Sequence, residues 1–247
     1  MTALEGKGAL VTGGSRGIGR AIVKRLSADG ATVVFAYARD QDAAAQTEQA
    51  VRAAGGIAHA VHADLADEAA VDHLIRQACE RLDGLDVLVN NAAAATPIRA
   101  IAETDVEVWE QAMNTNARAT FLLVRHAAHS MRDGGRIVNI STFNTIRPAA
   151  GIASYVASKA AVEQLTRVAA IELGPRGITA NVVSPGFTDT DLLRGVSPED
   201  ALPQLAKMSP LGRLGQPNDI SDVVAILVGP DGGWITGQTI HANGGVG

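Results

Sequence analysis

Residues 9–19 read Ala-Leu-Val-Thr-Gly-Gly-Ser-Arg-Gly-Ile-Gly, an apolar run that leads into a glycine-rich loop. A helical pattern on Ile22, Val23 and Leu26 follows the loop and closes at Gly30. Strand, glycine loop and helix in this order make a phosphate-binding turn, because glycines let the backbone turn tightly and approach a pyrophosphate at the helix N-terminus. The spacing Gly-x-x-x-Gly-x-Gly is a variant of the commoner dinucleotide pattern, and an ordinary glycine-rich turn is the alternative.

Beyond this unit, apolar runs keep alternating with helical patterns, which predicts an α/β fold: a doubly wound parallel sheet of about seven strands with helices on both faces. No linker or repeat interrupts the pattern, so residues 1–247 are expected to form a single domain. Residues 187–215 include three prolines and predict an irregular, mobile flap over the site. Strands are expected at 9–11, 32–37, 57–62, 85–89, 136–140, 178–183 and 238–242, and the main helices at 40–54, 68–82, 106–131 and 219–228.

Composition narrows the class of protein. Of the 247 residues, 47% are hydrophobic and 26 are glycine, which is typical of an α/β protein with close helix–sheet packing. A net charge of −5 gives no basic surface for nucleic acid or for an anionic membrane. Cys79 is the one cysteine, so neither a disulfide framework nor a thiolate zinc site is expected. The sequence has no signal-peptide pattern and no apolar run of membrane length, so a cytoplasmic location is expected.

Two histidines and two tryptophans stand out in the sequence, but we expect none of the four to act in catalysis. His126 and His129 stand three residues apart on an expected helix, a spacing that suits a metal ion, but no carboxylate or cysteine cluster accompanies them. A surface or interface role is therefore expected for both, and no metal site is predicted. Trp109 and Trp234 are expected in the core or at contacts between subunits.

Polar residues follow four of the predicted strands. Thr12, Asn90, Ser141–Thr142 and Pro185 all stand where an apolar run ends. Ligands of open parallel sheets bind at the carboxyl ends of the strands, so these four loops are expected to face one cleft.

Tyr155 and Lys159 stand four residues apart at the start of a helical pattern, on one face of the helix. A phenol titrates near ~10 and transfers protons poorly at neutral pH. A cation within about 4–6 Å favours the phenolate, so Lys159 is expected to lower the pKa of Tyr155. Together with a hydroxyl from Ser141 or Thr142, the two groups can hold a carbonyl oxygen and protonate it. By itself the pair also fits an ordinary contact along a helix.

The second strand ends at Tyr37, followed by Ala38 and Arg39, where an NAD site usually has an acid for the ribose hydroxyls. With Arg16 in the glycine loop, two guanidinium groups can converge on a 2′-phosphate. This favours NADP, and two solvated arginines are the alternative. Asp64, after the third strand, is placed either to contact an adenine or to cap a turn.

The order of Thr12–Gly19, Asn90–Ala92, Asn116, the Tyr155/Lys159 pair and Pro185-Gly186 resembles that of the short-chain dehydrogenase/reductase family. The likeness is greatest to its single-domain members near the 3-oxoacyl-acyl-carrier-protein reductases. It covers nearly the whole chain and extends to residues 177–181, 212–215 and 234–238.

The resemblance implies catalytic roles. Tyr155 is the general acid in reduction and the base in oxidation, Lys159 lowers its pKa and holds the nicotinamide ribose, and Asn116 holds a relay water. Counting thirteen residues back from the tyrosine places Thr142 where the family has serine, and alternation along the strand turns Ser141 to the other side. Thr142 can still donate to a carbonyl, although its methyl narrows the pocket. Ala93 also replaces a family glycine, which costs backbone freedom.

The resemblance further implies hydride transfer between NADP(H) and a carbonyl or alcohol substrate, either small or carrier-bound, such as a 3-oxoacyl thioester or another ketone. A homotetramer is expected. The alternatives are a non-catalytic NADP-binding regulator or redox sensor, and a nucleotide-sugar epimerase or dehydratase of the related longer scaffold. The expected cofactor residues are Gly13, Ser15, Arg16, Gly17, Ile18, Gly19, Tyr37, Arg39, Asp64, Leu65, Asn90, Ala92, Tyr155, Lys159, Pro185, Gly186, Thr188 and Thr190.

Overall fold

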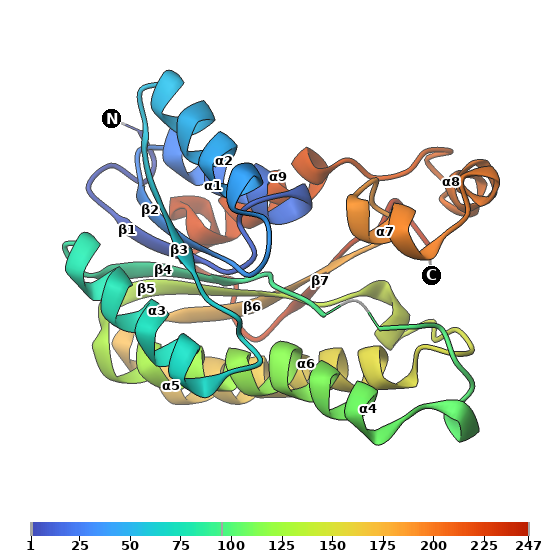
Figure 1. Ribbon diagram of the computed structural model, residues 1–247. Helices are drawn as coiled ribbons and strands as arrows, with labels where there is room; N and C mark the ends of the chain where they lie inside the picture. The colour runs from blue at the N-terminus through green and yellow to red at the C-terminus, as the bar shows by residue number, and fades with distance from the viewer. Residues whose placement is uncertain (1, 95, 247) are drawn as a thin grey trace.

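Seven parallel strands form one sheet in the order β3-β2-β1-β4-β5-β6-β7 (Figure 1). The computed structural model describes residues 2–94 and 96–246. The chain begins near the middle of the sheet, builds outward to β3, then returns past β1 to β4 and continues to β7. The strands are β1 (Gly8–Val11), β2 (Thr32–Tyr37), β3 (Ile57–His62), β4 (Leu85–Asn90), β5 (Met131–Ile140), β6 (Thr179–Pro185) and β7 (Thr239–Ala242).

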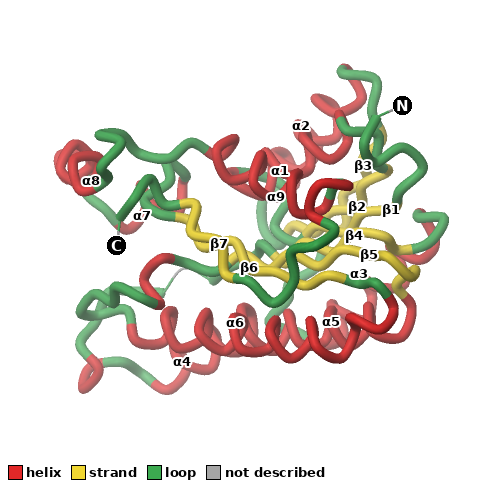
Figure 2. Tube along the Cα trace, turned by 180° about the vertical axis from the view of Figure 1, so that it is seen from behind, coloured by secondary structure: helices red, strands yellow, loops and turns green. Residues whose placement is uncertain are grey.

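Helices cover both faces of the sheet, as the alternating pattern predicts. One layer holds α1, α2 and α9, and the other holds α3 to α6 (Figures 1 and 2). The main-layer helices are α1 (Gly17–Ala28), α2 (Gln41–Ala53), α3 (Glu68–Arg81), α4 (Val106–Ala112), α5 (Ala119–Ser130), α6 (Ala153–Leu173) and α9 (Pro217–Val228).

The sheet separates two apolar cores. Along β1, Leu10 belongs to the core under α3 and α5, whereas Ala9 and Val11 belong to the core under α1 and α9. Because successive strand residues point to opposite faces, a strand that is buried on both sides needs a continuous apolar run. The central strands of this chain meet that requirement, and every residue of β1 and β4 is buried.

The expected helix at 106–131 is not a continuous α-helix. It contains α4, a π-helical segment at Met113–Arg118 and α5, and it ends at Ser130. A π turn holds more residues than an α turn, and such turns occur frequently at functional sites. Apolar periodicity does not reveal this change. Met131 has extended backbone angles and begins β5, so this strand is longer than predicted.

The prediction of an irregular stretch at 187–215 is wrong, because this flap includes the short helices α7 (Asp191–Val196) and α8 (Leu202–Met208). The Thr190 side chain caps α7, and Pro203 lies in the first turn of α8, where a missing N–H removes no helix hydrogen bond. The two ends of the flap meet: Gly215 N donates to Phe187 O at 2.8 Å. Both helices lie together at the end of the molecule away from the N-terminus (Figure 2).

Among the described residues, no helix combines the length and the apolar character that crossing a membrane requires.

Candidate active site

The glycine loop between β1 and α1 needs its glycines. Gly13 and Gly17 have φ angles of +67° and +54°, a region that side chains rarely adopt. A Cβ at Gly19 would lie 2.0 Å from Gly13 O. Arg16 provides no side-chain cap for α1, so the first N–H groups of the helix remain available. This cradle fits a pyrophosphate, whose negative charge a helix N-terminus favours.

A second loop is tied to the glycine loop by Thr12, which was expected to face the cleft, and by Asn91, which was not among the expected cofactor residues. Thr12 Oγ1 accepts hydrogen bonds from Asn91 N at 2.9 Å and from Ala92 N at 3.0 Å. Asn91 Nδ2 donates to Thr12 O at 3.0 Å and to Gly13 O at 3.1 Å. Asn90, which the family resemblance implies to be a strand-end residue that steadies the sheet beside the cofactor, donates from its side chain to Asn139 on the neighbouring strand, at 2.8 Å. The alternation that turns Asn90 away turns Asn91 toward the loop.

The end of β2 has no carboxylate beside it at positions 37–39. Arg16 and Arg39 are exposed, and Tyr37 is half-buried against His62, with ring centroids 5.5 Å apart. Among the described residues neither arginine forms an ion pair within 4 Å. Two uncompensated cations near the glycine loop suit an additional phosphate.

The third strand leads to Asp64 and Leu65, the pair expected near the adenine. Leu65 is buried, whereas Asp64 is exposed and its carboxylate accepts a hydrogen bond from Ala66 N at 3.1 Å. The turn-capping role of Asp64, one of the two alternatives, is therefore present, and one carboxylate oxygen remains free of that bond.

The first turns of α6 carry Tyr155 and Lys159. Lys159 is only 3% exposed, and Nζ donates to Ile140 O, at the end of β5, at 2.8 Å. Burial lowers the pKa of Lys159 to about 8. Tyr155 is half-buried; burial raises its pKa, and a side-chain hydrogen bond with Thr142 lowers it.

This arrangement corrects one expectation about the pair. Burial dominates the pKa of Tyr155, and the group that opposes burial is the Thr142 hydroxyl. Lys159 is not among the groups that set the pKa of Tyr155, and its ammonium group is directed to the Ile140 carbonyl.

The neighbouring hydroxyls after β5 contact different parts of α6. Thr142 lowers the pKa of Tyr155, while Ser141 Oγ donates to the Glu163 carboxylate at 2.6 Å. Thr142 keeps extended backbone angles, φ −156° and ψ 146°, so the alternation expected along the strand continues through this residue. On α6, Tyr155 and Glu163 are eight residues apart, which corresponds to about 12 Å along the helix axis.

Asn116 lies in the π-helical segment and is buried. Its Oδ1 accepts from Ala94 N at 2.8 Å, and its Nδ2 donates to Ser158 Oγ at 2.9 Å. Ser158 Oγ in turn is 2.7 Å from Tyr155 O, its acceptor. Asn116 is thus joined to the backbone of Tyr155 through Ser158, a residue for which the sequence gave no separate signal.

The flap brings the remaining expected residues to the same edge of the sheet. Pro185 ends β6, and Thr188 is buried with its hydroxyl 3.1 Å from Gly186 O. A Cβ built at Gly17 would lie 3.3 Å from Thr190 Cγ2, so the start of the flap lies against the glycine loop. The two loops therefore face one another across the carboxyl ends of the strands.

Comparison with known proteins agrees with this geometry. A family model described as enoyl-(acyl carrier protein) reductase matches residues 13–247. The 3-oxoacyl-[acyl-carrier-protein] reductase of Staphylococcus aureus is 38% identical over 242 residues, which cover 97% of this chain and 98% of that protein. The chain belongs to the short-chain dehydrogenase/reductase family. It is an oxidoreductase of that family.

Two solved structures extend the likeness to three dimensions. A short-chain dehydrogenase/reductase from Serratia marcescens has a TM-score of 0.94 at 42% identity, with 99% of each chain covered. A short-chain dehydrogenase from Burkholderia cenocepacia, in complex with NADP, has a TM-score of 0.92 at 39% identity, with 99% of each chain covered.

One departure from the short-chain dehydrogenase/reductase pattern proves less costly than expected. Ala93 stands where the family has glycine, but among the described residues no residue other than glycine has a positive φ. Ala93 therefore adopts a backbone conformation that any residue accepts, and it adds no left-handed strain beside the site.

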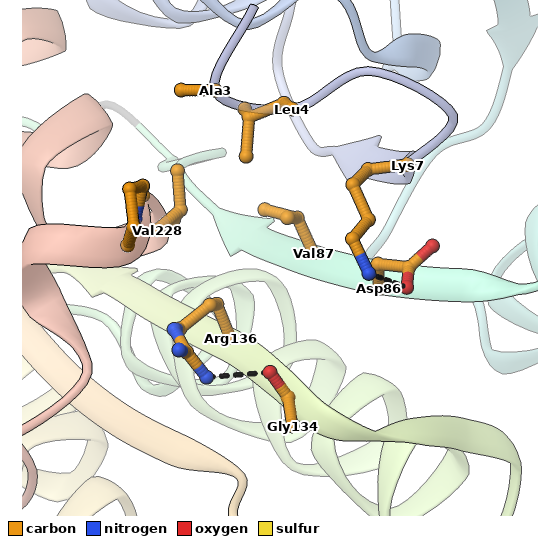
Figure 3. Close-up of a pocket in the computed structure, with 10 residues that line it drawn as sticks. Ala3, Leu4, Lys7, Asp86, Val87, Gly134, Arg136 and Val228 are labelled. Atoms are coloured by element: carbon orange, nitrogen blue, oxygen red, sulfur yellow. Dashed lines mark hydrogen bonds and ion pairs between the residues drawn. The ribbon is translucent and has the colours of Figure 1, made fainter. Parts of the chain in front are cut away.

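A cavity of about 220 Å³ lies at the opposite, amino-terminal edge of the sheet (Figure 3). It holds the Lys7–Asp86 ion pair, 3.0 Å long, and the Arg136 side chain. No residue expected to bind the cofactor or substrate lines this cavity. Its size therefore says nothing about the short-chain dehydrogenase/reductase chemistry, which depends on the loops at the other edge.

No group of three metal-ligand side chains occurs among the described residues. His126 Nε2 is 3.8 Å from Cys79 Sγ and 2.9 Å from Ser130 Oγ, and burial, then His129, lowers the pKa of His126. Trp109 and Trp234 are 43% and 99% exposed, so the core interpretation of these two residues is wrong.

Proposed function

We propose that the protein is an NADP(H)-dependent oxidoreductase that interconverts a ketone and its alcohol. One arrangement carries the proposal: Tyr155 and the buried Lys159 share the first turns of α6, and the Thr142 hydroxyl, at the end of β5, lowers the pKa of Tyr155 against the effect of burial. Bound NADPH would supply the hydride. The roles of the protein side chains follow from their placement.

In reduction, Tyr155 gives its proton to the carbonyl oxygen as negative charge develops there, and in oxidation it takes that proton back. Thr142 donates a hydrogen bond to the same oxygen, because its hydroxyl already points at the phenol. Lys159 binds the ribose beside the reacting ring. Asn116 positions a relay water near Lys159 and, through Ser158, supports the backbone of Tyr155.

NADP rather than NAD is the proposed cofactor. Arg16 and Arg39 are exposed cations without ion-pair partners among the described residues, and no acid at positions 37–39 repels a phosphate. The related Burkholderia cenocepacia structure, which holds NADP, supports this choice. The glycine loop from Gly13 to Gly19 would hold the pyrophosphate.

The proposed substrate is a ketone with an apolar body, of which a 3-oxoacyl thioester is one form. Loops that follow β4, β5 and β6 carry large apolar side chains that are exposed. These are Ile98, Ile146, Leu192, Val196, Met208 and Leu211. Such residues can cover an apolar substrate when the flap closes. A non-catalytic regulator has no comparable observation in its favour, since the phenol, the ammonium and a donor hydroxyl are all retained.

We further infer a homotetramer. Trp109, Phe121 and Ile171, on α4 to α6, are exposed, and Trp234 is almost fully exposed at the other side of the chain. Two separate apolar surfaces allow two kinds of symmetric contact, as a closed tetramer requires. Light scattering should give four times the monomer mass of 25.5 kDa at micromolar concentration, and a monomeric mass would contradict the assembly.

The proposed function is tested by following NADPH absorbance with purified protein and a panel of acyl thioesters, aliphatic ketones, quinones and keto sugars. We expect turnover with apolar ketones and a lower rate with keto sugars. The same panel with Tyr155→Phe distinguishes catalysis by this site from a contaminating reductase. Tight NADPH binding without turnover of any carbonyl would favour the regulator.

A further inference from the structure

Glu163 is a buried carboxylate that the proposed reaction does not use. It lies on α6 two turns beyond Tyr155 and one turn beyond Lys159, and only 8% of it is exposed. Among the described residues it has no ion-pair partner within 4 Å. A carboxylate in such surroundings is costly unless hydrogen bonds compensate it, so its partners indicate its role.

Both partners of this carboxylate are hydroxyls that flank Thr142. Glu163 Oε1 accepts from Ser141 Oγ at 2.6 Å and from Thr145 Oγ1 at 2.7 Å. Thr145 Oγ1 also lies 3.0 Å from Thr142 O, so its single hydrogen is placed between the carboxylate and the backbone of Thr142. The residue before Thr142 and the short turn after it are thus held by one oxygen atom.

The turn also sets the direction of the Thr142 hydroxyl. Thr142 Oγ1 accepts from Asn144 N at 3.3 Å, which leaves its hydrogen free to point toward Tyr155. Glu163 holds the hydroxyl that precedes Thr142 and, through Thr145, the turn that follows it. The carboxylate therefore fixes the backbone on both sides of Thr142.

We propose that Glu163 is a positioning residue for the carbonyl-activating hydroxyl: by holding Ser141 and Thr145, its carboxylate selects Thr142 and aims it at Tyr155. The inference rests on the proposed function for its meaning in catalysis, but the geometry it describes can be tested without a substrate. The chain has two tyrosines, Tyr37 and Tyr155, which makes a tyrosine-specific signal practical.

The test uses protein in which the tyrosine Cζ carbon is labelled with 13C, because the Cζ resonance responds to hydrogen bonding at the phenol. Tyr37→Phe assigns the Tyr155 signal, and Thr142→Val defines the change caused by losing the hydroxyl. Glu163→Ala should reproduce most of that change at pH 7. Val162→Ala, which truncates the adjacent buried side chain, is the matched control and should leave the signal in place.

A Tyr155 signal unchanged in Glu163→Ala, or unchanged in Thr142→Val, overturns the proposal. If Glu163→Ala does not fold, Glu163→Gln decides, because the amide keeps the shape and one acceptor oxygen. We expect Glu163→Gln to shift the signal partway toward that of Thr142→Val, and no shift counts against the proposal.

Kinetic measurements distinguish a positioning role of Glu163 from a merely structural one. Glu163→Ala should lower kcat about 10–100-fold, as a misplaced donor does, with the Kd for NADPH unchanged. In a Thr142→Val background the same substitution should have little further effect, since the group it positions is already absent. Equal losses in both backgrounds overturn the proposal. Absence of turnover in the wild type would refute the proposed function instead, and the Tyr155 signal would still decide the role of Glu163.

Discussion

Lys159 and Ile140 are joined by a hydrogen bond of 2.8 Å from the buried ammonium nitrogen to the last carbonyl oxygen of β5. A carbonyl dipole, rather than a carboxylate, therefore receives this charge. Burial lowers the pKa of Lys159 from 10.5 to about 8, so the protein keeps a cation at a place where the neutral amine is more easily accommodated.

This placement predicts that the cost of burying Lys159 falls as pH rises, so this residue's contribution to the free energy of unfolding increases with pH. Between about pH 8 and 10.5 the unfolded chain holds a proton on Lys159 that the folded chain has lost, so unfolding takes up a proton. Relative to Lys159→Met, the free energy of unfolding should increase by about 2 kcal/mol from pH 7 to pH 10. Denaturant unfolding without cofactor measures it. Parallel pH profiles for the two proteins would show that the lysine is not perturbed.

Tyr155→Phe should lower turnover by about 10²-fold or more, because it removes the proton donor and keeps the packing. Affinity for NADPH, measured by fluorescence titration, should persist. Lys159→Met is expected to weaken both turnover and cofactor binding. Near-normal activity in Tyr155→Phe would assign the proton to another group.

Substitutions at the two adjacent hydroxyls should have unequal effects. Thr142→Val has nearly the same shape but no donor, and it should cost about 10²–10³ in kcat. Thr142→Ser should stay active and accept bulkier ketones, since a methyl group leaves the pocket. Ser141→Ala should cost about tenfold or less, because Thr145 still engages Glu163. The reverse ranking of Thr142→Val and Ser141→Ala would move the assignment by one residue.

Cofactor preference should respond to charge at the end of β2. Replacing Tyr37 by Asp together with Arg39→Gln should shift the ratio of kcat/KM for NADPH over NADH roughly 10–100-fold toward NADH, the effect of losing one charged hydrogen bond. Arg52→Gln, an exposed arginine on α2, is the control. Wild-type protein that turns over NADH far better than NADPH would contradict the NADP assignment.

The hydrophobic periodicity of the sequence was sufficient to predict the strands of the sheet. It was less reliable where strands and helices begin and end. The buried strand β2 leaves an almost continuous apolar run and was predicted with its observed bounds, as was β3, although β3 is only partly buried and carries two histidines. Met131 was assigned to a helix, because an apolar residue at a helix end fits either element. The short helices of the flap depend on single caps such as Thr190, which a proline-rich segment obscures.

Side-chain directions within the site were harder to predict. Spacing and alternation both favoured Thr142 over Ser141, but neither could show that the Ser141 hydroxyl is engaged by Glu163 on α6. Glu163 belongs to no motif, and the Asn90–Ala92 motif did not indicate that the Asn91 side chain binds the glycine loop. Their roles depend on contacts between segments far apart in the chain, which one sequence does not contain.

The bond from Ala92 N to Thr12 Oγ1 spans 80 positions of the chain. A growing chain therefore completes β1, α1 and the glycine loop well before it has made the residues that hold this loop from the other side. Contacts of such sequence separation delay folding, since a long loop must close before they form. A chain that has folded only its first strand, glycine loop and helix therefore lacks the contacts that complete the nucleotide-binding loop. Cofactor can therefore act on this protein only after the sheet has closed around β1, and it would stabilise the finished fold without guiding its first half.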